Sequence, residues 1–297
     1  MDRACQAVEG FNTSYRLLQR HYDLNGKSQS TIINYGRCLA HMALHFDCCP
    51  SELDTEQVLD YLQFCKNQHK TPSDSFFKHT VYGLRALYKL KGMKDKHIVL
   101  PQLEGPKKLP VVLSRLEIKT FINTPKLLKH RLVLSLLYDC GLRRFELLNL
   151  QVPDLDFDRK MIHIRQGKGR KDRYVPLGNL LIRGLKTYLQ TEKPSEWLFT
   201  GNDRSGKTVP FSKGGVQWII RQTRKQSGIN KQVTAHTLRH SYATHLLEMG
   251  LDIVSLKEVL GHSCIETTMM YLHISRLGRQ QAFSPMDRIY QYNAPLR

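Results

Sequence analysis

Three prolines fall within ten residues of this 297-residue chain, and they separate two stretches of different character. Pro101, Pro106 and Pro110 stand in a run that also holds several lysines. Proline restricts its own backbone and that of the preceding residue, so a packed helix or strand is disfavoured there. The sequence therefore predicts a basic linker between two domains, with boundaries at 1–93, 94–110 and 111–297.

The stretch before this linker shows only helical periodicity. Apolar side chains recur every three or four residues in four segments, near 8–24, 29–46, 55–69 and 73–91. Ser51 and Asp54 are plausible caps before the third segment, and Gly92 follows the fourth as a C-cap. These patterns predict a helical first domain.

The stretch after the linker contains both helical periodicity and the two-residue alternation of strands. Ser114 and Glu117 form a capping-box pattern, and an apolar helix is expected at 127–139. Alternating residues predict strands at 161–165 and 173–177, and the remainder to 283 is expected to be mostly helical. The predicted fold class is mostly α with a small β-sheet, made of a helical domain followed by a mixed α/β domain.

Charge indicates a polyanionic partner. The formal net charge is +19, and the excess is uneven: residues 1–108 hold 15 basic against 11 acidic residues, whereas residues 109–297 hold 30 against 15. Nucleic acid is the first candidate and an anionic membrane surface the second. No stretch resembles a signal peptide or approaches the ~18 apolar residues of a membrane span. Seven scattered cysteines are typical of reduced thiols, so we expect a cytoplasmic protein.

The turn between the two predicted strands is the densest basic segment. Glycines alternate with cations there, and Asp172 is the only acid within nine residues. Such a protruding turn suits contact with a phosphate backbone, as does the basic linker. The predicted DNA-backbone contacts are Arg165, Arg170, Lys171, Arg173, Lys107 and Lys108.

Three short clusters carry residues able to bind and attack a phosphate. His236 and Arg239 share one helix face after the probable cap Thr234, where a helix N-terminus favours anions. Arg143 opens a helix with Glu146 three residues on, where the carboxylate could orient an arginine; the adjacent Arg144 competes for the role. His262 follows a Leu-Gly pair, and Tyr271 stands nine residues later.

Two groups of histidines and cysteines could in principle bind a metal, but neither forms a good ligand set. His41, His45, Cys48 and Cys49 have a workable ligand spacing, but the fourth ligand is strained. In a second set, His236, His240 and His245, the last histidine is off the face of the other two, and an arginine between them repels a cation. We therefore expect no metal and no cofactor.

Taken in order, these pieces resemble the tyrosine recombinase, or phage-type integrase, family. The matching residues are Gly-Leu-Arg143-x-x-Glu146, Gly-Lys168-Gly, His236-x-x-Arg239-His240, Leu-Gly-His262 and Tyr271. The segment Thr-Leu-Arg-His-Ser-Tyr-Ala-Thr-His-Leu-Leu is similar to the corresponding sequence in the Xer-type and integrative-element branches of the family. The resemblance spans the second domain as a catalytic domain, and the first domain resembles the family's helical, SAM-like core-binding domain.

The resemblance implies a site-specific recombinase that works without metal. Tyr271 would attack the scissile phosphorus and form a 3′-phosphotyrosyl link. Arg143 and Arg239 would hold the non-bridging oxygens, and Lys168 would protonate the leaving 5′-oxygen. His236 would act as general base and His262 would hydrogen-bond the phosphate. Glu146 and His240 would support these residues.

Partners and alternatives follow from the same resemblance. Recombination of two double-stranded DNA sites needs four cleavages, which implies a homotetramer on DNA and a monomer when free, associated with the nucleoid. The 26 residues after Tyr271 could pack on a neighbouring subunit or on their own domain. Two alternatives remain open here: a topoisomerase of type IB chemistry, and a DNA-binding regulator without catalysis on the same scaffold.

Overall fold

The protein forms two compact units, Met1–Pro106 and Lys107–Arg297. The computed structural model describes residues 1–67, 74–101, 109–165, 172–203, 205–272 and 274–275. Each unit has its own hydrophobic core.

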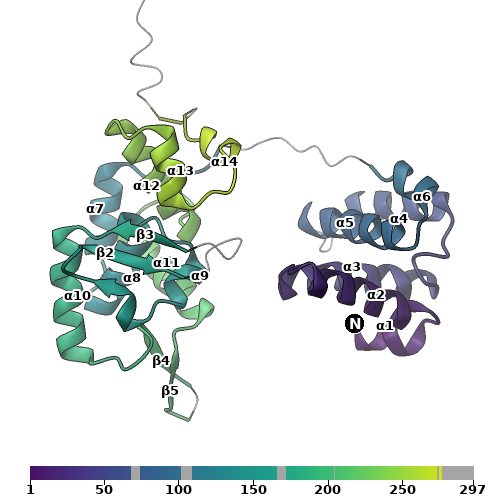
Figure 1. Ribbon diagram of the computed structural model, residues 1–297, viewed down its shortest axis with the longest axis horizontal. Coiled ribbons are helices and arrows are strands. Elements are labelled where there is room, and N and C mark those ends of the chain that lie inside the picture. The colour runs from purple at the N-terminus through teal and green to yellow at the C-terminus, as the bar shows by residue number, and fades with distance from the viewer. Residues whose placement is uncertain (68–73, 102–108, 166–171, 204, 273, 276–297) are drawn as a thin grey trace, which may run out of the picture. The chain divides into compact units, whose positions relative to one another are not determined.

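The first unit is helical, as the periodicity predicts. Its core includes Leu39 and Met42 of the third helix and Leu84 of the fifth, all almost fully buried. The central third helix packs against the first, second and fifth helices. In chain order the helices are α1 (Asp2–Ala7), α2 (Phe11–Leu24), α3 (Gln29–Phe46), α4 (Thr55–Asn67), α5 (Asp74–Leu90) and α6 (Lys94–Val99), drawn in purple to blue in Figure 1.

Two boundaries differ from the expectation. The helix expected near 8–24 starts only at Phe11, because Gly10 takes a left-handed conformation with φ of 72° and separates α1 from α2. The prediction of a linker at 94–110 is wrong for its first six residues, because Lys94–Val99 form α6. Lys96 donates hydrogen bonds to the backbone carbonyls of Ser51 and Leu53, and these contacts anchor α6 to the unit before the prolines begin.

The second unit is mixed, and the predicted fold class is confirmed. Its helices and strands follow one another along the chain as α7 (Arg115–Asn123), α8 (Leu128–Asp139), α9 (Arg144–Leu148), the 3-10 turn η1 (Val152–Asp154), β1 (Leu155–Asp156), β2 (Met161–Ile164), β3 (Arg173–Pro176), α10 (Asn179–Glu192), β4 (Thr200–Asn202), β5 (Thr208–Pro210), α11 (Lys213–Ser227), α12 (Ala235–Glu248), α13 (Ile253–Leu260) and α14 (Glu266–Met269).

A three-stranded antiparallel sheet and helix α8 form the core of this unit. The sheet has the order β1-β2-β3, and Ile162 of β2 pairs with Val175 of β3, both fully buried. Helix α8 is the expected apolar helix and packs against α10 and α12. Ser114 and Glu117 make the predicted capping box at the start of α7. No helix in the described ranges is long and apolar enough to cross a membrane.

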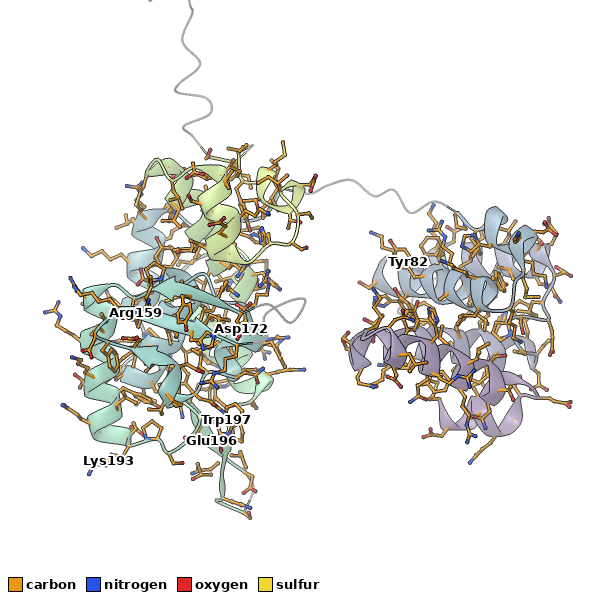
Figure 2. The ribbon with its side chains drawn as sticks, viewed as in Figure 1. Tyr82, Arg159, Asp172, Lys193, Glu196 and Trp197 are labelled. Atoms are coloured by element: carbon orange, nitrogen blue, oxygen red, sulfur yellow. The ribbon has the colours of Figure 1, made fainter. Side chains whose placement is uncertain are left out.

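A second hairpin interrupts the region expected to be helical after residue 178. Strands β4 and β5 pair with each other, and Figure 1 shows them projecting from the lower end of the unit. Glu196 and Trp197 lie where the hairpin leaves the unit (Figure 2). Each strand has only three residues, so the alternation that predicts a strand is too short to detect there.

Candidate active site

Helix α12 brings Arg239 into the centre of the second unit. Its side chain is 3% exposed, and the guanidinium donates through Nη1 to the carbonyl of Gly141 and through Nη2 to that of Leu260. Burial, with the neighbouring charge of Arg143, lowers the pKa of Arg239 to about 10. One buried side chain therefore binds the segment before Arg143 and the segment before His262.

The turn before α9 depends on a glycine. Gly141 has φ of 55°, and a Cβ on it would collide with the ring of Tyr242 on α12. A larger residue would thus push α12 away from the segment that carries Arg143. This close approach explains why the Gly-Leu-Arg sequence can place Arg143 beside Arg239.

Glu146 connects two arginines. Its carboxylate accepts from Nη1 of Arg143 at 2.7 Å and from both terminal nitrogens of Arg173 at 2.8 Å. Burial alone would raise the pKa of Glu146, but the hydrogen bonds and charges of Arg173 and Arg143 outweigh it and lower the pKa to about 2. Arg143 also donates to the carbonyl of Gly261 at 3.1 Å. The carboxylate thus orients Arg143, while Arg144 faces a neighbouring cleft.

The prediction that Arg173 contacts the DNA backbone disagrees with its position. Its side chain is only 10% exposed, and Nε donates to the carbonyl of Val259 at 2.9 Å. Glu146 accepts one hydrogen bond from each terminal nitrogen, so most of the donors of this guanidinium are used inside the unit. Arg165 is half-exposed and pairs with Asp154 at 2.6 Å.

Five predicted cations lie outside the described residues. They are Lys107, Lys108, Lys168, Arg170 and Lys171. Figure 2 shows Asp172 where the described part of the sheet resumes after the segment that carries three of them.

Tyr271 is in contact with two histidines. It follows α14 in a tight turn, is 2% exposed, and its hydroxyl lies 2.9 Å from Nδ1 of His240. The ring of His262 stacks on the phenol ring, with 6.4 Å between centroids. Nδ1 of His262 is 2.9 Å from the hydroxyl of Thr268. Burial raises the pKa of Tyr271, opposed by the charges of Arg239 and Arg143.

His236 does not contact Tyr271 through any hydrogen bond in the described residues. It lies one turn before His240 on α12, at the surface, with 6.2 Å between the two ring centroids. Partial burial and the charges of Arg239 and Arg143 lower its pKa. His240 is the histidine that lies within hydrogen-bond distance of the Tyr271 hydroxyl. That His236 takes the tyrosine proton stays a prediction.

A basic cleft opens beside Arg143 and His236. Its volume is about 790 Å³, and helix α11 forms one side of it. Lys213, Gln217, Arg221 and Arg224 line it at spacings of three or four residues, which place them on one face of α11. Sequence reasoning missed this face, although the spacing of its polar residues is visible in the sequence. Tyr271 does not line this cleft.

Comparison with known proteins identifies the class. The family model "Phage integrase family" matches residues 112–277, more than half of the chain, so the protein belongs to this family. It is a tyrosine-type site-specific recombinase, an enzyme that acts on DNA.

Particular relatives agree with this assignment. The chain is 34% identical to tyrosine recombinase XerA of Thermococcus onnurineus over 271 residues, covering 90% of this chain and 93% of the relative. It is 32% identical to tyrosine recombinase XerD of Listeria innocua over 281 residues, covering 87% and 92%. The Tn1549 transposon integrase, solved in complex with circular intermediate DNA, aligns with a TM-score of 0.68 at 18% identity over 95% of this chain and 99% of that one, which shows a shared fold.

Proposed function

We propose that this recombinase cleaves and rejoins double-stranded DNA through Tyr271, which forms a 3′-phosphotyrosyl intermediate. One observation carries the assignment: the buried phenol contacts two histidine rings and lies within the field of Arg143 and Arg239. A phosphate in this place would meet cationic donors and a nucleophile together. Covalent attachment conserves the bond energy of the phosphodiester, so rejoining needs no ATP.

Each remaining residue takes a role that its chemistry supports. Arg143 and Arg239 bind the non-bridging oxygens, and loss of one such donor typically raises the barrier by about 3–4 kcal/mol. His236 acts as general base on the tyrosine proton, and His262 hydrogen-bonds the phosphate. Lys168 protonates the leaving 5′-oxygen. Glu146 acts through Arg143 by fixing its guanidinium, as their 2.7 Å contact supports.

The DNA-binding surface extends beyond the reacting phosphate. The basic cleft along α11 suits the phosphate backbone beside the cleavage point, and Arg165, Arg170, Lys171, Lys107 and Lys108 add contacts from the hairpin and linker. The first unit acts as a core-binding domain that holds the same duplex. The active assembly is a homotetramer on two DNA sites, formed from monomers that work at the nucleoid.

Tyr271→Phe tests the nucleophile directly. Phenylalanine preserves the packing of the ring and removes only the hydroxyl, so DNA binding should persist while covalent protein–DNA adducts disappear. The adducts are measured on a denaturing gel with suicide substrates drawn from DNA flanking the gene. Tyr138→Phe is the matched control, because that phenol also bonds a histidine of α12 at 2.9 Å. Adducts that persist in Tyr271→Phe would overturn the assignment and direct attention to Tyr290 or Tyr292.

Cleavage should survive chelation of divalent metals. In the described part of the site the ionisable side chains that act on Tyr271 are arginines and histidines, and the nearby carboxylate, Glu146, is already bound by Arg143 and Arg173. A two-metal site would need several free carboxylates. Adduct formation with and without EDTA measures this, and activity that EDTA abolishes and magnesium restores would contradict the metal-free mechanism.

A further inference from the structure

Phe145 is an exposed aromatic side chain two residues after Arg143. Its exposed fraction is 60%, higher than that of any other phenylalanine, tyrosine or tryptophan among the described residues. The residues that follow it on α9, Glu146 and Leu147, are buried, so this short helix packs one side into the unit and presents Phe145 to solvent. A single exposed apolar side chain is ordinary on a protein surface, so its surroundings decide whether it has a role.

The ring of Phe145 lies in the basic cleft along α11. Arg144, Lys213 and Arg221 line the same cleft, and no aspartate or glutamate is found among the described residues that line it. Lys213 and Arg221 are themselves exposed. An aromatic ring beside cations in a groove is typical of surfaces that bind unpaired nucleotides, because the cations attract phosphates and the ring stacks on a base.

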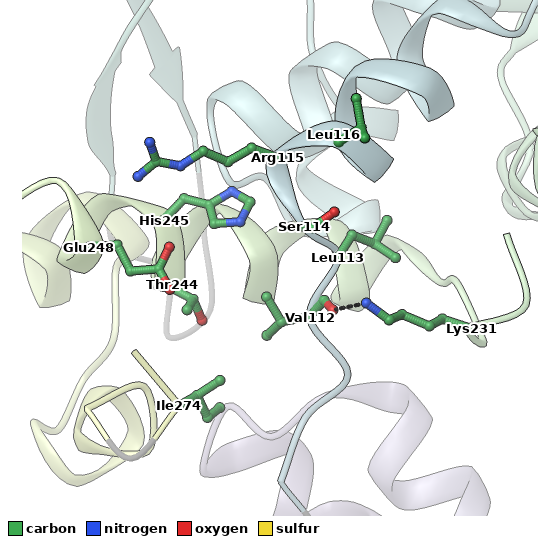
Figure 3. Close-up of a pocket in the computed structure, with 10 residues that line it drawn as sticks. All are labelled: Val112, Leu113, Ser114, Arg115, Leu116, Lys231, Thr244, His245, Glu248 and Ile274. Atoms are coloured by element: carbon green, nitrogen blue, oxygen red, sulfur yellow. Dashed lines mark hydrogen bonds between the residues drawn. The ribbon is translucent and has the colours of Figure 1, made fainter. Parts of the chain in front are cut away.

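A second cavity of the same unit lacks this combination. It has a volume of about 660 Å³ and is shown in Figure 3. The exposed apolar side chain there is Leu116, and Glu248 lines the cavity together with Arg115 and Lys231, so its charges are mixed. Within the described part of the chain no phenylalanine, tyrosine or tryptophan lines it. Of these two cavities, only the cleft beside Arg143 joins an aromatic ring to cations without a carboxylate.

We propose that Phe145 stacks on the terminal base of the 5′-hydroxyl strand that cleavage releases and rejoining recaptures. The inference rests on the proposed function, in which Arg143 holds the scissile phosphate. The Cα atoms of Arg143 and Phe145 are at most about 7 Å apart, since two residues separate them by no more than two extended peptide units. Successive nucleotides rise about 3.4 Å along one strand, so Phe145 stands within reach of the nucleotide next to that phosphate.

Stacking requires a base with a free face. Inside a duplex each base is covered on both sides by its neighbours, whereas the base at a strand end has one face free. Cleavage through Tyr271 leaves the 5′ side of the break as such an end. Phenylalanine has no side-chain hydrogen-bond donor or acceptor, so the contact tolerates any of the four bases. The ring therefore holds the strand end near the reacting phosphate without reading its sequence.

Strand transfer from a trapped adduct tests this contact. The covalent adduct is formed on a suicide duplex taken from DNA flanking the gene, and a short 5′-hydroxyl oligonucleotide complementary to the exposed strand is added. The rate of rejoining is measured against oligonucleotide concentration for wild type, Phe145→Ala and Phe145→Tyr. A second oligonucleotide is identical except that its 5′-terminal nucleotide lacks a base. Leu180→Ala is the control, because Leu180 is 77% exposed on α10 and lines neither cavity.

Phe145→Ala should raise the oligonucleotide concentration that gives half-maximal rejoining by about 5- to 150-fold, the usual effect of removing one base–aromatic stack. With the oligonucleotide that lacks the terminal base, wild type and Phe145→Ala should be alike, because there is no base left to stack. Phe145→Tyr keeps the ring and should stay near wild type with both oligonucleotides. Leu180→Ala should match wild type throughout.

Two results at Phe145 would overturn the inference. One is wild-type half-saturation in Phe145→Ala, and the other is an equal loss with both oligonucleotides, since the ring would then act on something other than the terminal base. Absence of adducts in Phe145→Ala would overturn it too, because the ring would then be needed for cleavage itself. Failure of the proposed function is distinguishable, as wild type would then form no Tyr271-dependent adduct at all.

Discussion

At the scale of single residues, Lys168 can be tested through the leaving group. Lys168 stands between two glycines in the sequence, and its proposed role is to protonate the leaving 5′-oxygen. A 5′-bridging phosphorothiolate has a thiolate leaving group that needs no proton. Lys168→Ala should therefore slow cleavage of a normal phosphodiester far more than that of the phosphorothiolate, as measured by single-turnover rates.

Arg143→Ala serves as the comparison for this prediction. It removes charge stabilisation from the non-bridging oxygens, so both substrates should slow to a similar degree. Equal rate losses for the two substrates in Lys168→Ala would remove the general-acid role. Lys171 of the same turn would then be the next residue to test.

Local spacing in the sequence predicts some of the contacts in the candidate site but not others. The short spacing from Arg143 to Glu146 fixes their contact within one helical turn, and the structure brings them to 2.7 Å. The contacts of Glu146 with Arg173 and of His240 with Tyr271 join residues 27 and 31 positions apart. Such pairs depend on how the helices pack, and local spacing holds no information on that.

At the scale of elements, α12 contains a buried hydroxyl without a hydrogen-bond partner in the described structure, that of Thr244. Valine has a nearly identical shape and no polar group to desolvate. Thr244→Val should therefore raise the free energy of unfolding by about 1 kcal/mol. Urea unfolding followed by tryptophan fluorescence measures it, because both tryptophans, Trp197 and Trp218, belong to the second unit.

Thr237→Val is the matched change on the same helix. The hydroxyl of Thr237 donates to the carbonyl of Gln232 at 3.2 Å and accepts from the backbone N–H of Thr234 at 3.1 Å. Its removal should lower the unfolding midpoint. If both valine variants shift the urea unfolding midpoint in the same direction, the effect of Thr244→Val does not come from an unsatisfied hydroxyl.

Elements with a long apolar stripe were predictable, and short ones were not. Helices α3 and α8 lie where the periodicity puts them, since each spans at least three turns. Helix α6 and the β4–β5 hairpin are too short to show a period. Their formation depends on contacts such as those of Lys96 with distant carbonyls.

At the scale of the whole molecule, the charge should make DNA binding strongly salt-dependent. Residues 109–297 alone carry 30 basic against 15 acidic residues. A protein making about 6–10 phosphate contacts should lose on the order of 10³–10⁵ in affinity from about 50 to about 200 mM salt, because binding releases counterions. Titration of labelled duplex across this range measures the slope. Affinity that barely changes would argue against a charge-driven clamp.

The two carbonyls bound by Arg239 have a consequence for how such proteins can diverge. Gly141 and Leu260 stand 98 and 21 residues from Arg239, yet a single guanidinium fixes the position of both. The lengths of the connecting stretches therefore do not determine the geometry at the centre. Insertions or deletions between these anchor points, such as in the projecting β4–β5 hairpin, can accumulate while the reacting groups stay in register.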